Sequence, residues 1–142
     1  MTKLVAAAVA GLVMLSSATY AGGAEGTWVS EDGGLNVRLS DCGGVLCGKV
    51  VWLNEPIDRV TGKPKTDKLN PDPAKRSLPL IGLKVAKNFK PIGRNEWAGT
   101  IYNADDGHSY RAYLKVEDAR TARLQGCVLA IFCRGHTWTR TN

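Results

Sequence analysis

The sequence is poor in the side chains that most enzymes use for catalysis. It contains only two histidines, His108 and His136, and no Gly-x-Ser-x-Gly motif to hold a nucleophilic serine on a strained turn. It also lacks a glycine-rich loop of the kind that binds phosphate groups. We therefore predict that the protein is not an enzyme and needs no cofactor. A hydrolase that acts through Arg134 and His136 is the least favoured hypothesis.

Basic residues are in moderate excess, but no tract of the sequence concentrates them. The 19 lysines and arginines against 13 acidic residues give a formal net charge of +6 at pH 7. Proteins that bind nucleic acid usually gather their basic residues on one face or in one stretch. The even spread favours a solvated surface, so we predict no nucleic-acid partner.

The sequence has one long hydrophobic run, and it lies near the first residue. Residues 4–15 are apolar, follow the charged Lys3 and precede a stretch rich in small residues. The run is shorter than the roughly 20 residues that span a bilayer, and its flanks are typical of a secretory signal. We expect residues 1–21 to be removed as a signal peptide, with a cut after Ala24 as the alternative. Residues 22–142 then form a single periplasmic or secreted domain without an integral membrane segment.

Cysteine is scarce, but its number and placement are informative. All four cysteines lie in the predicted mature part, and an even number in an exported chain predicts disulfides. Of the three possible connectivities we favour Cys42–Cys47 and Cys127–Cys133, because each pair brackets a short segment that can turn back on itself. These spacings, without an adjacent histidine, do not fit a zinc site, so we predict no metal.

Apolar and polar residues alternate along most of the predicted mature part, which indicates β-strands. Eight short segments are expected to be strands: 26–30, 35–39, 45–53, 83–89, 95–102, 108–116, 121–127 and 133–140. Turn signals separate several of them, at 31–34, 42–44, 91–95 and 104–107. About eight antiparallel strands can close into a small barrel that leaves no strand edge exposed. We therefore favour an all-β barrel over a β-sandwich.

One long polar loop interrupts the regular strand spacing. Residues 54–79 hold five of the six prolines, and a loop of this length in a small domain is usually functional or mobile. Asp67, Asn70 and Arg76 are candidates for a ligand clamp at the mouth of the barrel. The alternative, which we favour, is that Asx turns and an Asp–Arg pair order the loop. The spacing of these residues does not match a calcium-binding loop.

Several segments stand out together: GTW (26–28), CGGVLCGKVVWL (42–53), DKLNPDPAKRSLPLIGL (67–83), IYNADDGHSY (101–110) and GCVLAIFCRGHTWTR (126–140). In this order they resemble the bacterial domain of unknown function 2147 family. The resemblance covers nearly the whole predicted mature chain, with His136 standing where glutamine is expected. It implies an exported, lipocalin-like β-barrel, and it supplies no biochemical activity.

The last predicted strand carries the most informative polar residues. If that strand is regular, Arg134, His136, Trp138 and Arg140 share one face, and Trp138 turns this face inward. One hypothesis is a pocket whose carboxylate-binding end is formed by Arg134 and Arg140, since guanidinium groups match carboxylates with paired hydrogen bonds. The alternative, which we favour, is an arginine that packs across a tryptophan and closes the bottom of the barrel.

Aromatic residues from several predicted strands can either line a ligand cavity or fill the core. The set comprises Trp28, Trp52, Trp97, Tyr102, Tyr110 and Trp138. The sequence leaves both possibilities open for this set. It also leaves two functions open for the whole protein. The first is a carrier for a small apolar or amphipathic ligand, in one version with an acidic end. The second is a cell-envelope protein-interaction module whose 54–79 loop docks on a protein partner.

Overall fold

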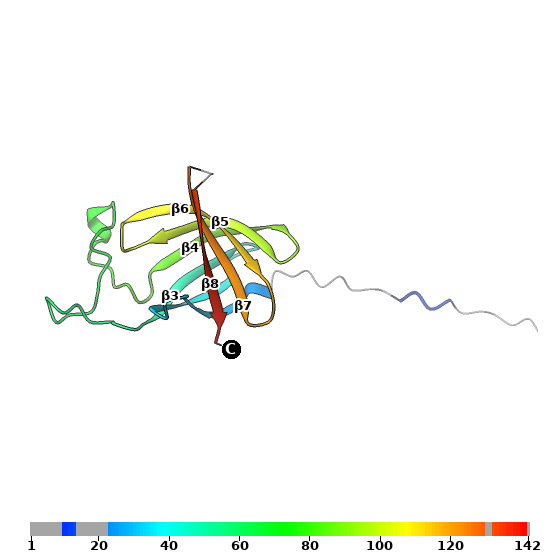
Figure 1. The fold of residues 1–142 in the computed structure, drawn as a ribbon, viewed down its shortest axis with the longest axis horizontal. Helices are drawn as coiled ribbons and strands as arrows, with labels where there is room; N and C mark the ends of the chain where they lie inside the picture. Colours follow the sequence, from blue (N-terminus) through cyan, green and yellow to red (C-terminus); the bar gives the residue numbers. More distant parts are fainter. Residues whose placement is uncertain (1–9, 14–22, 130–131, 142) are drawn as a thin grey trace, which may run out of the picture.

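The computed structural model describes residues 10–13, 23–129 and 132–141, and their strands form a closed antiparallel barrel (Figure 1). The strands are β1 Gly26–Val29, β2 Leu35–Asp41, β3 Leu46–Leu53, β4 Lys84–Gly93, β5 Glu96–Asn103, β6 His108–Val116, β7 Thr121–Val128 and β8 Phe132–Arg140. Each strand pairs with the next one, and β1 closes the barrel by pairing with β8. The prediction of a small all-β barrel of about eight strands is confirmed.

The predicted signal peptide, residues 1–21, falls mostly on residues 1–9 and 14–22, which lie outside the described part of the chain. The expected cut after Ala21 lies there too, so the signal peptide stays a prediction. Among the residues that the structure describes, no helix is long and apolar enough to cross a membrane.

Inward-facing side chains fill much of the barrel. Trp28, Val37 and Phe89 are almost completely buried, and burial of such a side chain stabilises a fold by roughly 1.5–3 kcal/mol. Gly99 allows Phe89 to pack against β5, because a Cβ atom at position 99 would lie only 2.6 Å from Phe89 Cδ2. The Phe89 side chain therefore fills the barrel interior next to β4 and β5.

Arg140 closes the end of the barrel at which β1 begins and β8 ends. Its guanidinium carbon lies 4.4 Å from the centroid of the Trp28 ring, and it donates hydrogen bonds of 2.5 Å to the carbonyl oxygens of Gly23 and Glu25. The Trp28 indole nitrogen donates in turn to the carbonyl oxygen of Ala24 at 2.9 Å. For Arg140, the favoured alternative of an arginine packed across a tryptophan is confirmed.

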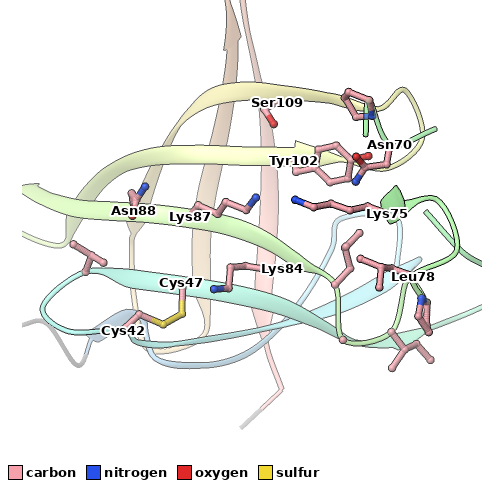
Figure 2. Close-up of a pocket in the computed structure, with 16 residues that line it drawn as sticks. Cys42, Cys47, Asn70, Lys75, Leu78, Lys84, Lys87, Asn88, Tyr102 and Ser109 are labelled. Atoms are coloured by element: carbon pink, nitrogen blue, oxygen red, sulfur yellow. A yellow bond between two sulfur atoms is a disulfide. The ribbon is translucent and has the colours of Figure 1, made fainter. Parts of the chain in front are cut away.

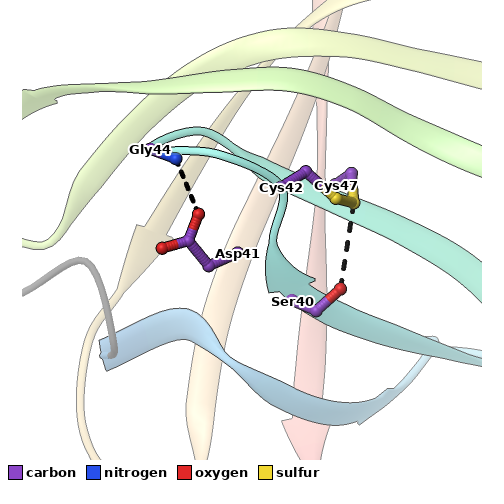
Figure 3. Close-up of a disulfide and its surroundings, with 5 residues drawn as sticks. All are labelled: Ser40, Asp41, Cys42, Gly44 and Cys47. Atoms are coloured by element: carbon purple, nitrogen blue, oxygen red, sulfur yellow. Dashed lines mark hydrogen bonds between the residues drawn. A yellow bond between two sulfur atoms is a disulfide. The ribbon is translucent and has the colours of Figure 1, made fainter.

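Both predicted disulfides are present. Cys42–Cys47 lies at the turn between β2 and β3, and Cys127–Cys133 joins β7 to β8. Figure 3 shows the first of these, with Asp41 accepting a hydrogen bond from a backbone N–H of the same turn at 2.7 Å. Two disulfides are compatible with an exported protein.

The predicted turn at residues 91–95 is mostly wrong, because β4 continues to Gly93. Pro91 pairs with Trp97 of β5, and the register shifts between Lys87 and Lys90 and again between Pro91 and Gly93. Asn88, within the first of these shifts, has a positive φ of 54°. Proline is tolerated within a strand at such bulges, where its missing N–H breaks no regular hydrogen bond.

The loops after β1, β3, β5 and β7 lie at one end of the barrel, which we call the mouth. The loop between β3 and β4 is the longest of them and extends well beyond the strands (Figure 1). It contains two isolated β-bridges and one short 3₁₀ turn: Ile57↔Pro64, Thr66↔Pro79 and η2 Pro73–Lys75. The loop therefore has local structure of its own.

Candidate functional site

A cavity of about 1010 Å³ opens at the mouth of the barrel and is the candidate site. Its volume is at the upper end of the roughly 300–1,000 Å³ typical of small-molecule pockets. Apolar residues of four strands contribute its walls: Leu35, Ile101, Leu124 and Trp138. Polar and charged residues also line it: Glu31, Asp32, Asn103, Asp106, Tyr110, Arg134 and His136. The cavity thus combines an apolar surface with charged groups of both signs.

Gly126 leaves open space at the wall of this mouth cavity. Along β7, Ala122 and Leu124 are buried in the core, and period-2 alternation places Gly126 on the same inward face. A Cβ atom built on Gly126 meets no atom within 4 Å. In the β7–β8 register Gly126 lies opposite Arg134. A larger side chain at position 126 would therefore project into the cavity beside that arginine.

Arg134 and His136 line the mouth cavity from β8, on the same face as Trp138. The Nδ1 atom of His136 lies 3.2 Å from Oε2 of Glu31, on the loop after β1. In the described ranges, Arg134 has no hydrogen-bond or ion-pair partner. Its guanidinium group is free to bind an acidic group that enters the cavity.

Tyr110 and Asp106 form a polar pair beside the β5–β6 turn. The Tyr110 hydroxyl donates a hydrogen bond of 2.5 Å to Oδ2 of Asp106. This bond, with a second one from the backbone N–H of His108, holds the pKa of Asp106 below its usual value. The same pairing raises the pKa of Tyr110. Asp106 is therefore ionised at neutral pH and adds negative charge to the lining.

Asp32 supplies a second negative charge to the mouth cavity. Its Oδ1 atom accepts hydrogen bonds from the Ser30 hydroxyl at 2.7 Å and from the backbone N–H of Gly34 at 2.9 Å. These bonds, the Ser30 bond first, lower the pKa of Asp32. Acids thus lie on the loops after β1 and β5, whereas Arg134 lies on β8.

Asp67 and Tyr102 attach the long loop to the barrel. Asp67 is fully buried, and it accepts 2.7 Å hydrogen bonds from the Tyr102 hydroxyl and from the side-chain amide of Asn70. Burial, followed by the bond to Asp67 and its charge, raises the pKa of Tyr102 to about 12. Both oxygens of Asp67 are therefore occupied by protein donors, which supports a structural role for this acid.

Asn70 and Arg76, the other two candidates for a ligand clamp, form hydrogen bonds within the long loop. Arg76 donates through Nε to the carbonyl oxygen of Asn70 at 2.8 Å. It forms no ion pair with any acid of the described residues, so the predicted Asp–Arg pair is wrong. The predicted Asx turns are confirmed, since Asn70 Oδ1 accepts from the backbone N–H of Asp72, and Asp72 does the same for Ala74. Asn70 and Arg76 thus order the loop.

Three of the predicted ligand-binding residues lie away from the mouth cavity. Trp97 is only 2% exposed and belongs to the core. Trp52 is 46% exposed. It pairs with Asn36 of β2, whereas Val50 pairs with Val37, so one extra residue of β3 forms a bulge between the two pairs. This bulge turns the Trp52 side chain to the outside of the barrel. Of the two possibilities left open for the aromatic set, Trp97 therefore takes the core-filling one. Trp52 takes neither, so its candidacy as a cavity-lining residue is wrong.

Arg140 is the third of these residues. It lies six residues from Arg134 on β8, which corresponds to roughly 20 Å along a strand. Arg140 closes the far end of the barrel, whereas Arg134 lines the mouth. The prediction of one carboxylate-binding end formed by both arginines is therefore wrong.

The predicted residues that line the mouth cavity are Tyr102, Tyr110, Arg134, His136 and Trp138. Sequence reasoning missed several others: Glu31, Asp32, Ile101, Leu124 and Gly126. The alternation of Ala122, Leu124 and Gly126 along one predicted strand was a usable signal for the last two. It places a residue without a side chain at the mouth end of an inward face.

The barrel as a whole matches the model of a known protein family. The family model described as "Uncharacterized protein conserved in bacteria (DUF2147)" matches residues 26–140, from the first residue of β1 to the last residue of β8. The chain belongs to this family. The resemblance to the DUF2147 family that the sequence suggested is therefore confirmed. The family description names no activity. No curated protein matches the chain.

A solved structure supports the same fold for this DUF2147 member. It is described as "Protein HP1028 from the human pathogen Helicobacter pylori belongs to the lipocalin family". The similarity has a TM-score of 0.71 at 19% identity and covers 83% of this chain and 82% of that chain. At this identity the likeness shows the fold alone, which is a lipocalin-like barrel.

Proposed function

We propose that this protein is an exported binding protein that holds a small amphipathic ligand with an acidic end in the mouth cavity. The observation that carries the proposal is the open space at Gly126 beside Arg134, which has no partner in the described part of the chain. Apolar side chains of Leu124 and Trp138 line the same cavity. This combination suits a ligand with one apolar part and one negatively charged group.

Binding follows from ordinary desolvation and charge pairing. An apolar chain that contacts Ile101, Leu124 and Trp138 gains roughly 25 cal/mol for each Å² of apolar surface removed from water. A carboxylate on the ligand can accept two parallel hydrogen bonds from the Arg134 guanidinium group. The acids Glu31 and Asp106 disfavour other positions for the negative end, so charge also sets the orientation. This role involves no catalysis and no cofactor.

A fluorescence titration with 11-(dansylamino)undecanoic acid tests the proposal, because this acidic amphiphile becomes brighter in an apolar site. The wild-type protein is expected to bind the probe. Gly126→Leu fills the open space and is expected to weaken binding by about tenfold or more. Gln125→Leu, on the exposed face of the same strand, is the matched control and is expected to bind like the wild type. Equal affinity in all three proteins contradicts the proposal.

A second candidate is the protein-interaction module, and one feature of the long loop favours it. Val60 is 95% exposed and lies in the small hairpin closed by the Ile57↔Pro64 bridge. A photo-crosslinking amino acid at position 60, activated in intact cells, is expected to give one adduct of defined mass if the loop docks on a protein. Without such an adduct this candidate fails, and the ligand-binding proposal is unaffected.

A further inference from the structure

A second cavity, of about 910 Å³, lies between the outer face of the barrel and the long loop (Figure 2). Three lysines line it: Lys75 from η2 and Lys84 and Lys87 from β4. In Figure 2 the side chain of Lys75 extends from the loop toward Lys87 on the strand, and Lys84 lies on the same strand nearer the loop. No acidic residue of the described chain lines this lysine cleft.

The charges of the three lysines are not neutralised by the protein. Within the described ranges none of them forms an ion pair, whereas Lys65, Lys68 and Lys115 each pair with an acid. In addition, Lys49 on β3 lies directly opposite Lys84 on β4. Like charges in such cross-strand positions destabilise a sheet. The positive charge gathered here therefore has an energetic cost that a bound anion would relieve.

The loop holds Lys75 in place without using its side chain. The backbone N–H of Lys75 donates to the carbonyl oxygen of Asp72, and its own carbonyl accepts from Leu78, at 3.0 and 3.1 Å. The segment is attached to the barrel through the Asp67–Tyr102 hydrogen bond. It also packs so closely on the β5–β6 turn that a Cβ atom at Gly107 would lie 2.1 Å from the Leu69 carbonyl oxygen. The Lys75 ammonium group therefore remains available to a ligand.

Uncharged hydrogen-bonding groups complete the lysine cleft. Ser109 pairs in register with Tyr102, and both residues line the cleft, as does Asn88 at the bulge of β4. In the described residues, the Ser109 hydroxyl and the Asn88 amide have no hydrogen-bond partner. Both groups can donate to oxygen atoms of a bound anion.

We propose that the lysine cleft binds a ligand that carries two or more phosphate groups. Lysine binds phosphate as a compact point charge, and three lysines around one concave site raise the local concentration of anions. A ligand with a single negative charge would leave most of this charge unbalanced, whereas clustered phosphates would balance it. The site is distinct from the mouth cavity, and it does not depend on the function proposed there.

Calorimetric titration with inorganic tripolyphosphate at low ionic strength tests this proposal. Lys75→Gln/Lys87→Gln is expected to weaken binding by about tenfold or more, since two of the three ammonium groups are lost. Lys63→Gln/Lys90→Gln is the matched control: it removes the same charge from the same loop and strand, but neither residue lines the cleft. The control, and Gly126→Leu in the mouth cavity, are expected to bind like the wild type. Thermal unfolding verifies that each variant is folded.

Sedimentation with phosphatidylcholine vesicles, with and without cardiolipin, distinguishes the sources of the phosphate. If cardiolipin vesicles retain the wild type but not Lys75→Gln/Lys87→Gln, the source is a phospholipid headgroup. Binding of tripolyphosphate without vesicle binding assigns a soluble phosphate compound. The proposal is overturned if the wild type binds neither probe, or if the two double variants lose binding equally.

Discussion

The hydroxyl group of Tyr102 donates a 2.7 Å hydrogen bond to the buried carboxylate of Asp67, which lies 35 residues earlier in the chain. This bond joins the middle of the long loop to β5. Tyr102 also lines both the mouth cavity and the lysine cleft. One side chain therefore links the position of the loop to both candidate binding sites.

Tyr102→Phe is expected to lower the free energy of unfolding by about 1–3 kcal/mol, because it leaves a buried acceptor of Asp67 without its donor. Urea unfolding measures this loss, and limited proteolysis is expected to cut faster within residues 54–83. Tyr113→Phe is the matched control: on the exposed side of β6 the Tyr113 hydroxyl accepts a hydrogen bond from Arg111 Nε, and it has no other partner in the described residues. Its effect is expected to stay within about 0.5 kcal/mol. Equal effects of the two substitutions would refute the attachment role.

The two arginines of β8 are expected to differ in what they contribute. Arg140→Ala removes the contact with Trp28 and two hydrogen bonds to backbone carbonyls, so we expect it to destabilise the fold by about 2 kcal/mol or more. Arg134→Ala is expected to change stability by less than about 0.5 kcal/mol. It is expected to weaken binding of the acidic fluorescent probe by about tenfold. Unfolding and titration of both variants check this; loss of stability in Arg134→Ala with unchanged binding would reverse the assignment.

The pairing of Tyr110 with Asp106 predicts a specific pH dependence of stability. The hydrogen bond lowers the pKa of Asp106 in the folded state below the reference value of 3.8. The stability that this provides is present above that value and is lost as the pH falls through the lower folded pKa. Tyr110→Phe is therefore expected to be less stable than the wild type at pH 6, and the difference is expected to shrink below about pH 3.8. Urea unfolding over this pH range measures it, and parallel curves would exclude the pairing as the cause.

Much of the fold could be predicted from the sequence because strand positions depend on local alternation. Residues 108–116 form a strand at both expected ends, and the other predicted boundaries lie within a few residues of the observed ones. The errors occur where a bulge breaks the alternation. The bulge at Asn88 accompanies the longer β4, and the bulge at Val51 turns Trp52 outward. Neither bulge carries a strong sequence signal.

The candidate sites were less predictable because they depend on contacts between distant segments. Arg134, His136 and Trp138 were found because they share one strand face. The lysine cleft could not be predicted from the sequence, because Lys75 and Lys87 line one cavity only when the Asp67–Tyr102 hydrogen bond holds the loop against the barrel. Alternation gives the face of each strand, but it gives neither the free volume inside the barrel nor the path of a long loop.

Native mass spectrometry of the protein purified from its own cell envelope tests the ligand-binding claim most directly. The wild-type barrel is expected to carry a small acidic amphiphile, seen as an added mass that organic extraction removes. Gly126→Leu, prepared in the same way, is expected to be free of this mass because the leucine side chain projects into the mouth cavity beside Arg134. Gln125→Leu is expected to retain it. The same mass on all three proteins, or no added mass on any of them, would contradict the claim.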